Sequence, residues 1–512
     1  MNSSLSLIVV LAPLLGVLLV LLVPSRRESI AKWIALGAAA VPAALAVYLY
    51  SAFDRTLTVA ADNHGMQFIQ HSDLIERLHI ELHLGVDGVG VAMVLLAALV
   101  SLVAVGASWG ITKNARGYFA LLLLVETGTL GVFCALDLVL FFVCWVMMLL
   151  PMCFLVGGWG GPHRRPAARK LFLGTLAGSV LILLIFLALH FKSGPAEHTF
   201  DLLKMTYLDA ARFEDASLLL FGSSFAKVCW IGLFVGFAIL IPIIPDALVE
   251  APTPVAVLLA GVLLKTGTYG ILRINFGLLP RTTEWAGSVT TVSGVAIILY
   301  GAFRAFTQTD LKKLVAYSSV SLMGYCLVGL GAFTQAGLDG AVMQMFNHGI
   351  IAAMLFLLVG AVHDRAHTGD LDKLGGAATQ MPILAGFFGF AFLAALGLPG
   401  LAGFIGEALV LLGAFPASPL LTMLAAAGLI LTAAYHLRAI QRIRLGPRNE
   451  AQNPPFPDLS MRERLMLLPM ATIVLILGFY PMPLLKLIGP GLNDLLAHVT
   501  GHAGAGALAS LP

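Results

Sequence analysis

The sequence predicts an all-α protein that crosses a membrane about 14 times. Hydrophobic residues make up 59% of the 512 residues, charged residues only 11%, and the mean hydropathy is +0.94. A soluble domain carries about 25% charged residues, so this chain lacks the charge to cover a water-exposed surface. Its apolar residues also fall into runs of about 20, the length that a transmembrane helix needs.

Fourteen runs meet this criterion, although only Leu136 and Asp137 separate the fourth from the fifth. The first run follows an uncharged start and precedes Arg26 and Arg27. A cleaved signal peptide carries its positive charge in front, so we interpret the first run as a retained helix. The predicted helices are 5–23, 31–51, 86–110, 117–135, 137–158, 170–191, 224–245, 253–273, 285–305, 312–333, 339–361, 380–413, 418–441 and 463–485.

Basic residues gather in alternate loops of this predicted topology. Lys and Arg accumulate in short cytoplasmic loops, so the loops 52–85 and 192–223 and both termini are expected on the periplasmic side of a bacterial inner membrane. The loop that contains Asp246 and Glu250 is an exception to the pattern. The basic residues are Arg26, Arg27, Lys32, Lys113, Arg116, Arg164, Arg165, Arg169, Lys170, Lys312, Lys313, Arg438, Arg442, Arg444 and Arg448.

Gly and Pro interrupt two of the predicted helices. Pro242 and Pro245 break the seventh, and the stretch 396–403 breaks the twelfth. Paired broken segments indicate a transporter built from inverted repeats, and a Pro kink without function is the alternative. We therefore predict two inverted five-helix repeats. The expected parts are amino-terminal helices in 1–110, a first repeat in 111–251, a second in 252–415, and carboxy-terminal helices with a loosely ordered periplasmic tail after Pro490 in 416–512.

Few ionisable residues lie inside the predicted helices, and such residues mark an ion path or a paired structural site. Lys265 lies in the eighth helix, His348 in the eleventh and Glu407 in the twelfth, and Glu126 lies in the fourth. A Lys–His–Glu series is suited to passing protons on, because each group exchanges a proton. The same residues are also suited to holding helices together by hydrogen bonds. The three together favour a relay.

Other kinds of site are not indicated. The formal charge of +3 is too small to suggest nucleic acid binding. The five cysteines lie in apolar runs with no metal or iron–sulfur spacing, so we expect buried core residues and no metal, redox centre or other cofactor. The cysteines are Cys134, Cys144, Cys153, Cys229 and Cys326.

Seven stretches of the chain carry a family resemblance. They are His83-Leu-Gly-Val-Asp-Gly, Gly131-Val-Phe-Cys-Ala-Leu-Asp-Leu-Val-Leu-Phe, Glu250-Ala-Pro-Thr, Leu263-Leu-Lys-Thr-Gly-Thr-Tyr-Gly-Ile-Leu-Arg, Asp310-Leu-Lys-Lys-Leu-Val-Ala-Tyr-Ser-Ser-Val, Phe346-Asn-His-Gly and Leu398-Pro-Gly-Leu-Ala-Gly-Phe-Ile-Gly-Glu. In this order, over essentially the whole chain, the sequence resembles the antiporter-like subunit M of bacterial respiratory complex I. The resemblance implies a subunit of a proton-translocating NADH:quinone oxidoreductase, in contact with L-like and N-like chains.

By the same resemblance, Lys265 is the central relay lysine, His348 its partner and Glu407 the terminal group toward the periplasm. Lys312, Lys313 and Glu126 are additional candidates. Two family positions depart from the pattern: Val146 stands in place of a glutamate in the fifth helix, and Leu240 in place of a lysine in the seventh. Losing both partners of a buried pair costs less than losing one. The chain therefore looks like a divergent member in which proton entry through the amino-terminal half is closed, or in which protons enter by another route, with Glu126 as a possible substitute carboxylate.

Three hypotheses of function follow. In the first, the chain relays protons through Lys265, His348 and Glu407 as a complex I subunit, without a catalytic site of its own. In the second, it is a structural paralogue that pumps nothing, which the absent Glu–Lys pair favours. In the third, it belongs to a cation/proton antiporter or an inorganic-carbon uptake complex. The subunit M-like stretches favour the first hypothesis.

Overall fold

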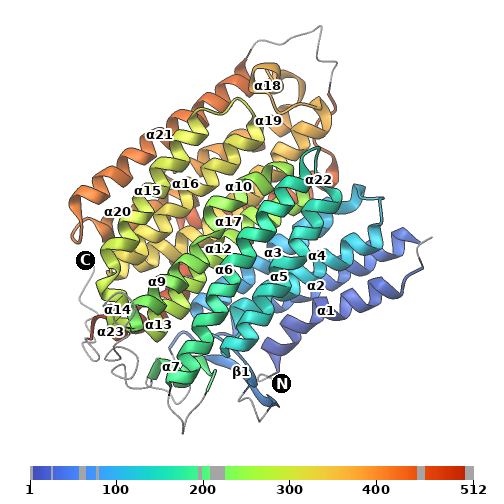
Figure 1. Cartoon of the computed structure of the whole chain (residues 1–512). Helices are drawn as coiled ribbons and strands as arrows, with labels where there is room; N and C mark the ends of the chain where they lie inside the picture. Colours follow the sequence, from blue (N-terminus) through green and yellow to red (C-terminus); the bar gives the residue numbers. More distant parts are fainter. Residues whose placement is uncertain are drawn as a thin grey trace.

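The computed structural model describes residues 4–24, 27–56, 65–75, 80–193, 199–207, 225–446 and 456–501. Long helices lie side by side in a bundle, with the amino-terminal helices at one edge and α21 at the other (Figure 1). Twelve of the described helices are long and apolar enough to cross a membrane, and a pair bent by 71° makes a thirteenth. Two shorter apolar helices form one more interrupted element. The predicted all-α membrane fold is therefore confirmed.

In the first half of the bundle, the side chains of Asp87, Asn114 and Asp137 cap the starts of α3, α4 and α5. Asp87 accepts a hydrogen bond from the Gly90 amide (2.7 Å), and Asp137 accepts one from the Leu140 amide (2.8 Å), as N-cap carboxylates do. The elements are α1 (Leu5–Leu22), α2 (Glu28–Ala52), β1 (Gln67–Ile75), β2 (Ile80–Val86), α3 (Gly88–Ala107), α4 (Ala115–Cys134), α5 (Leu138–Trp159), α6 (Arg164–Lys192), α7 (Leu202–Tyr207), α9 (Phe225–Ala238) and α10 (Leu240–Glu250).

In the second half, Asp310 and Thr334 cap the long helices α16 and α17. Asp310 accepts from the Lys313 amide (3.0 Å), and Thr334 accepts from the Gly337 amide (3.1 Å). Its elements are α11 (Thr253–Leu258), η3 (Leu259–Leu263), α12 (Leu264–Gly270), η4 (Ile271–Asn275), α13 (Phe276–Leu278), α14 (Pro280–Trp285), α15 (Gly287–Phe306), α16 (Leu311–Gly331), α17 (Gln335–Ala366), α18 (Ala377–Gln380), α19 (Pro382–Ala395), α20 (Ala402–Ala414), α21 (Pro419–Leu445), α22 (Met461–Phe479) and α23 (Met482–Thr500).

The predicted break in the twelfth helix is present, because that helix divides into α19 and α20. The seventh is only interrupted at Ile239, and Pro242 and Pro245 lie inside α10, so residues 225–250 form one span. Within the break of the twelfth helix, Gly397 and Gly400 adopt φ of +77° and +91°, which glycine accepts without the steric cost of a Cβ. The assignment of the two halves as inverted repeats stays a prediction.

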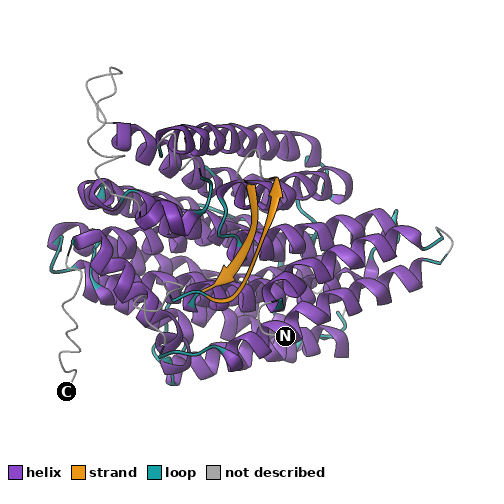
Figure 2. Cartoon of the chain, turned by 90° about the horizontal axis from the view of Figure 1, so that it is seen from below, coloured by secondary structure: helices purple, strands orange, loops and turns teal. Residues whose placement is uncertain are grey.

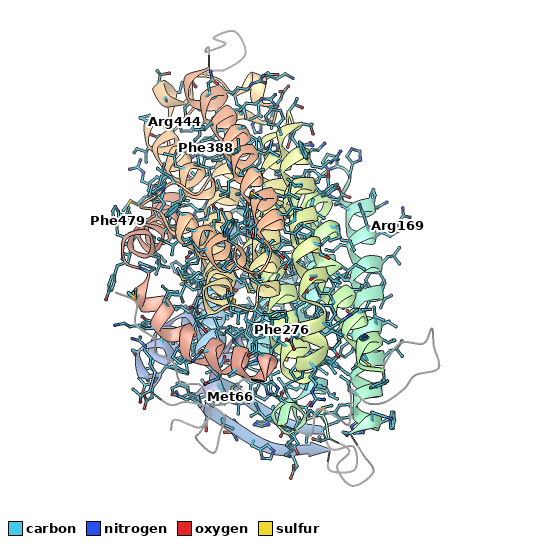
Figure 3. The ribbon with its side chains drawn as sticks, turned by 90° about the vertical axis from the view of Figure 1, so that its left-hand side faces the viewer. Met66, Arg169, Phe276, Phe388, Arg444 and Phe479 are labelled. Carbon is cyan, nitrogen blue, oxygen red and sulfur yellow. The ribbon has the colours of Figure 1, made fainter. Side chains whose placement is uncertain are left out.

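One end of the bundle collects the basic residues. The Lys32 ammonium donates to the carbonyl of Trp109 (2.8 Å), and the Arg438 guanidinium donates to the carbonyl of Phe306 (2.9 Å). Figure 3 places Arg444 toward this end. The shared end agrees with the predicted alternation of loops. Of the basic residues on which that prediction rests, Arg26 and Arg448 lie outside the described residues.

The opposite end carries the hairpin and the first and last described helices. The Ser6 hydroxyl donates to the carbonyl of Phe68 (2.7 Å), and His498 lies 3.3 Å from the carbonyl oxygen of Gly277. Figure 3 shows Met66 and Phe276 near this end. The start of α1 and the end of α23 therefore lie on the same side of the bundle. Their assignment to the periplasm stays a prediction.

Two local features differ from the sequence prediction. The loop 52–85 contains the antiparallel hairpin β1–β2, which lies across the end of the bundle (Figure 2). Residues after Pro490 continue as helix to Thr500 instead of forming a loose tail, and the remainder of the predicted tail, 502–512, lies outside the described residues. Both segments gain order from contacts with the bundle, such as the hydrogen bond from the Leu136 amide to the carbonyl of His83 (2.9 Å). Such contacts leave no periodic signal in the sequence. All five cysteines are buried and unpaired, as predicted.

Candidate proton-relay site

Lys265 lies in a helical segment that is wound unusually. The helix from Thr253 to Leu278 contains two π-helical stretches, η3 and η4, and Lys265 follows η3 after a single residue. Its side chain is fully buried, and its ammonium donates to the carbonyl of Ala260 inside η3. Short π segments frequently mark functional sites. Here the wider turn leaves a carbonyl that the buried lysine uses as its hydrogen-bond partner.

His348 lies on α17, where this helix crosses the lysine helix at close range. A Cβ at Gly261 would lie 3.3 Å from the carbonyl oxygen of Gly349, and one at Gly349 would lie 2.8 Å from that of Gly261. Gly349 directly follows His348, so the crossing brings the histidine close to the helix that bears Lys265. His348 is 1% exposed, and neither ring nitrogen has a hydrogen-bond partner among the described residues.

Glu407 lies on α20, directly opposite the break in the twelfth span. Its side chain is buried, and Oε1 lies 3.5 Å from Nε2 of Gln344 on α17. A Cβ at Gly397 would lie only 2.3 Å from Oε2 of Glu407. The positive φ and missing side chain of Gly397 therefore allow the broken backbone to pass over the carboxyl group. The Asn347 amide also ties α17 to the start of α20 by donating to the carbonyl of Ala402 (2.7 Å).

The structure adds a fourth titratable side chain, His436 on α21. It is fully buried, its Nδ1 lies 2.9 Å from the carbonyl oxygen of Thr432, and its Nε2 has no partner among the described residues. Its ring meets that of Phe392 on α19 edge-on, with centroids 5.3 Å apart, and lies 4.5 Å from the ring of Tyr435. The sequence analysis missed His436, although a histidine within a predicted span was a signal. Its position two residues before Arg438 suggested the membrane surface.

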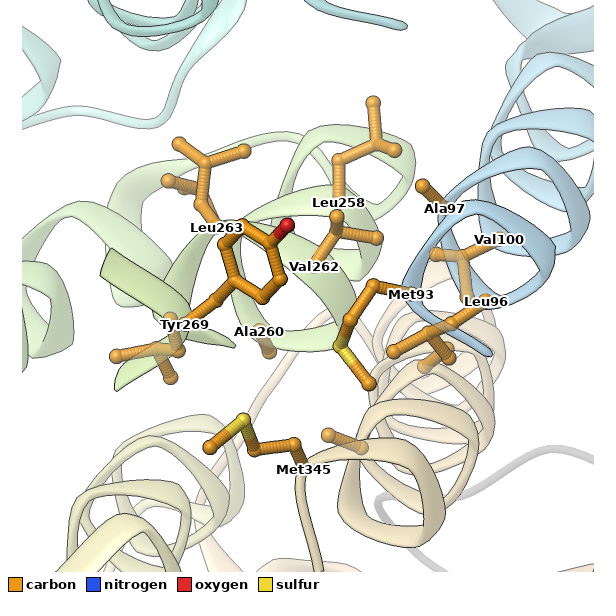
Figure 4. Packing of buried hydrophobic residues seen from close by; sticks show 14 of the residues in the cluster. Met93, Leu96, Ala97, Val100, Leu258, Ala260, Val262, Leu263, Tyr269 and Met345 are labelled. Atoms are coloured by element: carbon orange, nitrogen blue, oxygen red, sulfur yellow. The ribbon is translucent and has the colours of Figure 1, made fainter. Parts of the chain in front are cut away.

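Around the lysine helix the packing is apolar and tight. Figure 4 shows side chains of α3, such as Met93 and Leu96, meeting Val262 of η3, with Met345 of α17 on another side. These residues are at most 1% exposed. Such packing excludes water from the surroundings of Lys265 and strengthens electrostatic interactions there.

A hollow opens toward each end of the same helix. At the basic end, a cavity of about 700 Å³ is lined by Thr253, Lys312 and residues of α17 such as Leu357. At the hairpin end, a smaller cavity of about 100 Å³ is lined by Tyr269 and Arg273 among others. At about 1.5 Å per helical residue, the large cavity, which Pro254 also lines, reaches to about 17 Å from Lys265 along the helix, and the small cavity reaches to about 6 Å.

The smaller hollow is lined by both members of an ion pair, Asp87 and Arg273. Arg273 pairs with both carboxylate oxygens of Asp87, at 3.0 Å and 2.9 Å, the bidentate geometry that gives strong, directional pairing. The Tyr269 hydroxyl donates to the carbonyl of Phe133 (3.1 Å). Sequence reasoning assigned no role to this pair, because Asp87 and Arg273 lie 186 residues apart.

The three additional candidates lie elsewhere. Lys312 donates to the carbonyl of Ala251 (2.6 Å) and lines the large cavity together with the exposed Lys313. Glu126 is 1% exposed on α4, and neither of its carboxylate oxygens has a partner among the described residues. Lys312 and Lys313 thus belong to the basic end, and Glu126 belongs to the amino-terminal half.

The two departures from the family pattern lie next to an aromatic cluster. Trp145, beside Val146, meets the ring of Phe237 edge-on at 5.3 Å and stacks near Phe141 at 6.1 Å. Leu240 is fully buried one turn after Phe237, and it lies 3.7 Å from the position of a Cβ at Gly267. Leu240 therefore lies in apolar packing, and the half-buried Val146 follows Trp145 on α5.

Comparison with known proteins identifies the family. The model of the NADH:quinone oxidoreductase/Mrp antiporter transmembrane family matches residues 135–432. NADH-quinone oxidoreductase subunit M of Rickettsia typhi is 36% identical over 96% of this chain and 98% of its own length. The corresponding Escherichia coli subunit M is 35% identical over 93% and 94%. This chain belongs to the subunit M family of NADH-quinone oxidoreductase. It is therefore a membrane-arm subunit of proton-translocating complex I.

Solved structures agree with this assignment. A chain of respiratory complex I from Thermus thermophilus superposes with a TM-score of 0.83 at 28% identity, covering 98% of this chain and 100% of the other. A chain of the Mrp complex from Dietzia shares the fold, with a TM-score of 0.82 at 20% identity over 97% and 99%. Both are membrane complexes of several chains, consistent with the predicted partnership with other membrane-arm subunits.

Proposed function

We propose that this subunit M passes protons through Lys265, His348, His436 and Glu407 in its carboxy-terminal half. The observation that supports this most is the arrangement of buried titratable groups on α12, α17, α21 and α20. Two of them, His348 and His436, carry buried nitrogen atoms that have no hydrogen-bond partner among the described residues. Unpaired buried polar groups cost free energy, so their retention favours a function over a purely structural role.

The proposed route begins at the basic end. The large cavity brings water to Thr253 and Lys312, and the segment from there to Lys265 is the first barrier. The proton then moves from Lys265 to His348, and His436 with Tyr435 connects His348 to Glu407. Release on the hairpin side, through the broken twelfth span, is part of the proposal. The energy comes from the redox reaction in other subunits, because the route uses only side chains of this chain and water.

The deciding experiment compares wild type with Lys265→Met in inside-out membrane vesicles that contain the assembled complex. Methionine removes the ammonium group and keeps most of the volume. We expect the ratio of protons pumped to electrons transferred to fall, with NADH-dependent quinone reduction persisting. Lys486→Ala, an exposed lysine on α23, is the control and is expected to leave the ratio unchanged. An unchanged ratio in Lys265→Met would refute the relay.

The second candidate function is a spacer subunit that holds the membrane arm together without pumping. The aromatic packing beside Val146 and Leu240 favours it, because the amino-terminal half offers no charged pair there. The two candidates differ in the outcome of the Lys265→Met experiment. A spacer predicts wild-type stoichiometry in every variant of Lys265, His348 and Glu407 that still assembles.

A further inference from the structure

The hairpin carries a cluster of metal-binding side chains that the proposed proton route does not use. In the antiparallel register, His71 lies directly opposite His83, and Asp73 lies opposite Glu81. Side chains alternate between the two faces of a strand, so all four residues project from the same face. Candidate ligand atoms of His71, Glu81 and His83 lie within 4.8 Å of one another.

The three side chains are already arranged around a common point. Nε2 of His71 lies 2.8 Å from Oε2 of Glu81, and the two histidine rings meet edge-on with centroids 5.0 Å apart. His71 is half exposed, whereas the side chains of Glu81 and His83 are 13% and 9% exposed. The cluster is thus open to solvent through His71 and closed on its inner side.

Asp201 supplies a further feature of a metal centre. Its Oδ2 lies 3.3 Å from Nδ1 of His83, a nitrogen that is buried and lacks an aligned hydrogen-bond partner among the described residues. Histidines that bind metals usually present the other ring nitrogen to a carboxylate, which fixes the ring and its tautomer. With Nδ1 directed at Asp201, Nε2 of His83 is left for an ion.

The backbone around the cluster is held firmly. The carbonyl of His83 accepts from the Leu136 amide (2.9 Å), and the Leu202 amide donates to the carbonyl of Leu136 (2.8 Å). The hairpin, the α4–α5 link and the segment before α7 are therefore tied together beneath the side chains. Rigid elements of this kind hold ligands near a productive geometry.

Both carboxylates of the cluster also contact a lysine. Lys204 lies 3.2 Å from Glu81 and 3.4 Å from Asp201, with its side chain 57% exposed. It therefore competes with a cation, and it is free to turn toward solvent.

We propose that His71, Glu81 and His83 bind a divalent transition metal ion of the zinc type, with Asp201 orienting His83. Two imidazole nitrogens and one carboxylate suit Zn²⁺ and leave a fourth position for water. Mg²⁺ is disfavoured, because it prefers six oxygen ligands in octahedral geometry. The ion would join the two strands of the hairpin at the end of the bundle where α7 lies.

Zn²⁺ binding to the purified, chelator-treated complex tests the proposal. Equilibrium dialysis against Zn²⁺ should show one more bound ion per complex in wild type than in His71→Gln, whose half-exposed side chain is replaceable without loss of folding. His163→Gln, at the basic end, is the matched control and should keep the wild-type number. X-ray absorption on the additional ion should show nitrogen ligands at about 2.0–2.1 Å.

Two competition experiments, one on Lys204 and one with Mg²⁺, test the proposed site further. Lys204→Met should tighten Zn²⁺ binding about twofold to fivefold, the range expected from removing an exposed ion pair, and a hundredfold excess of Mg²⁺ should not displace Zn²⁺. Equal numbers of bound Zn²⁺ in wild type and His71→Gln would overturn the proposal. Displacement by Mg²⁺ would also overturn it.

Discussion

The two halves of this subunit fill the interior of the bundle differently, one around apolar side chains and the other around buried ionisable side chains. Around Trp145 and Phe237, aromatic rings fill the space, and hydrophobic Val146 and Leu240 occupy the two family positions. Around His348 and Glu407, buried polar groups are kept although several lack ideal partners. Apolar packing is stable without partners, whereas a buried ionisable group needs a counter-charge or a function. Apolar packing therefore surrounds Leu240 in the amino-terminal half, where Glu126 is the exception as a buried carboxylate without a partner among the described residues, whereas the carboxy-terminal half keeps several buried ionisable residues.

Introducing a charge into the apolar half should have the largest effect. Leu240→Lys places an ammonium in a fully buried position, and an uncompensated buried charge costs about 3–5 kcal/mol. We expect the variant to fail to assemble, as measured by the amount of subunit in the purified complex, with Leu240→Met as the volume control. The double variant Val146→Glu with Leu240→Lys should recover part of the loss. Normal assembly of Leu240→Lys alone would show that water reaches position 240 despite its apolar packing.

Removing the buried carboxylate from each half in turn, Glu407 or Glu126, should show which half conducts protons. Glu407→Gln keeps the shape of the side chain and removes its proton exchange, so we expect proton transfer through this subunit to slow by about 10², the lower range for a positioned acid or base. Glu126→Gln should leave pumping unchanged, because Glu126 lies in the half where the family pair is absent. Proton-to-electron ratios in vesicles measure both. A loss in Glu126→Gln equal to that in Glu407→Gln would mean that the amino-terminal half still conducts.

The broken twelfth span offers a smaller, steric test. Gly397 has φ +77° and its missing Cβ faces the Glu407 carboxyl group, so Gly397→Ala should cost about 1–3 kcal/mol of strain. We expect a lower melting temperature and weaker pumping. Gly386→Ala is the matched control. Gly386 lies on the same broken span, and a Cβ there would have no neighbouring atom within 4 Å. Similar melting temperatures for the two variants would contradict the close approach.

The smallest expected effect tests the residue that the sequence analysis missed. If His436 carries protons, His436→Gln and His436→Phe should both lower pumping, by up to about tenfold or roughly 1.4 kcal/mol. If His436 only holds the helix through its contact with Thr432, His436→Gln should pump as the wild type does, and His436→Phe should pump less. Pumping ratios for the two variants, measured in intact complexes, distinguish these roles.

The site was readable from the sequence only in part. Lys265, His348 and Glu407 stood out because each is an ionisable residue inside an apolar run, which is a local signal. His436 carried the same signal more weakly, since basic residues follow it within one turn. The Asp87–Arg273 pair and the His71–Glu81–His83 cluster gave none, because each depends on residues that meet only after the chain folds.

The sequence by itself determined the class of protein, the order of the spans, the position of the break in the twelfth span and the end at which the basic residues gather. These features follow from run length, charge and the presence of Gly and Pro, which are properties of neighbouring residues. Only the tertiary structure decided that π-helical turns hold Lys265, that an aromatic cluster fills the amino-terminal half, and that the hairpin folds across the end of the bundle. Those outcomes depend on contacts between segments far apart in the chain, and no local pattern contains them.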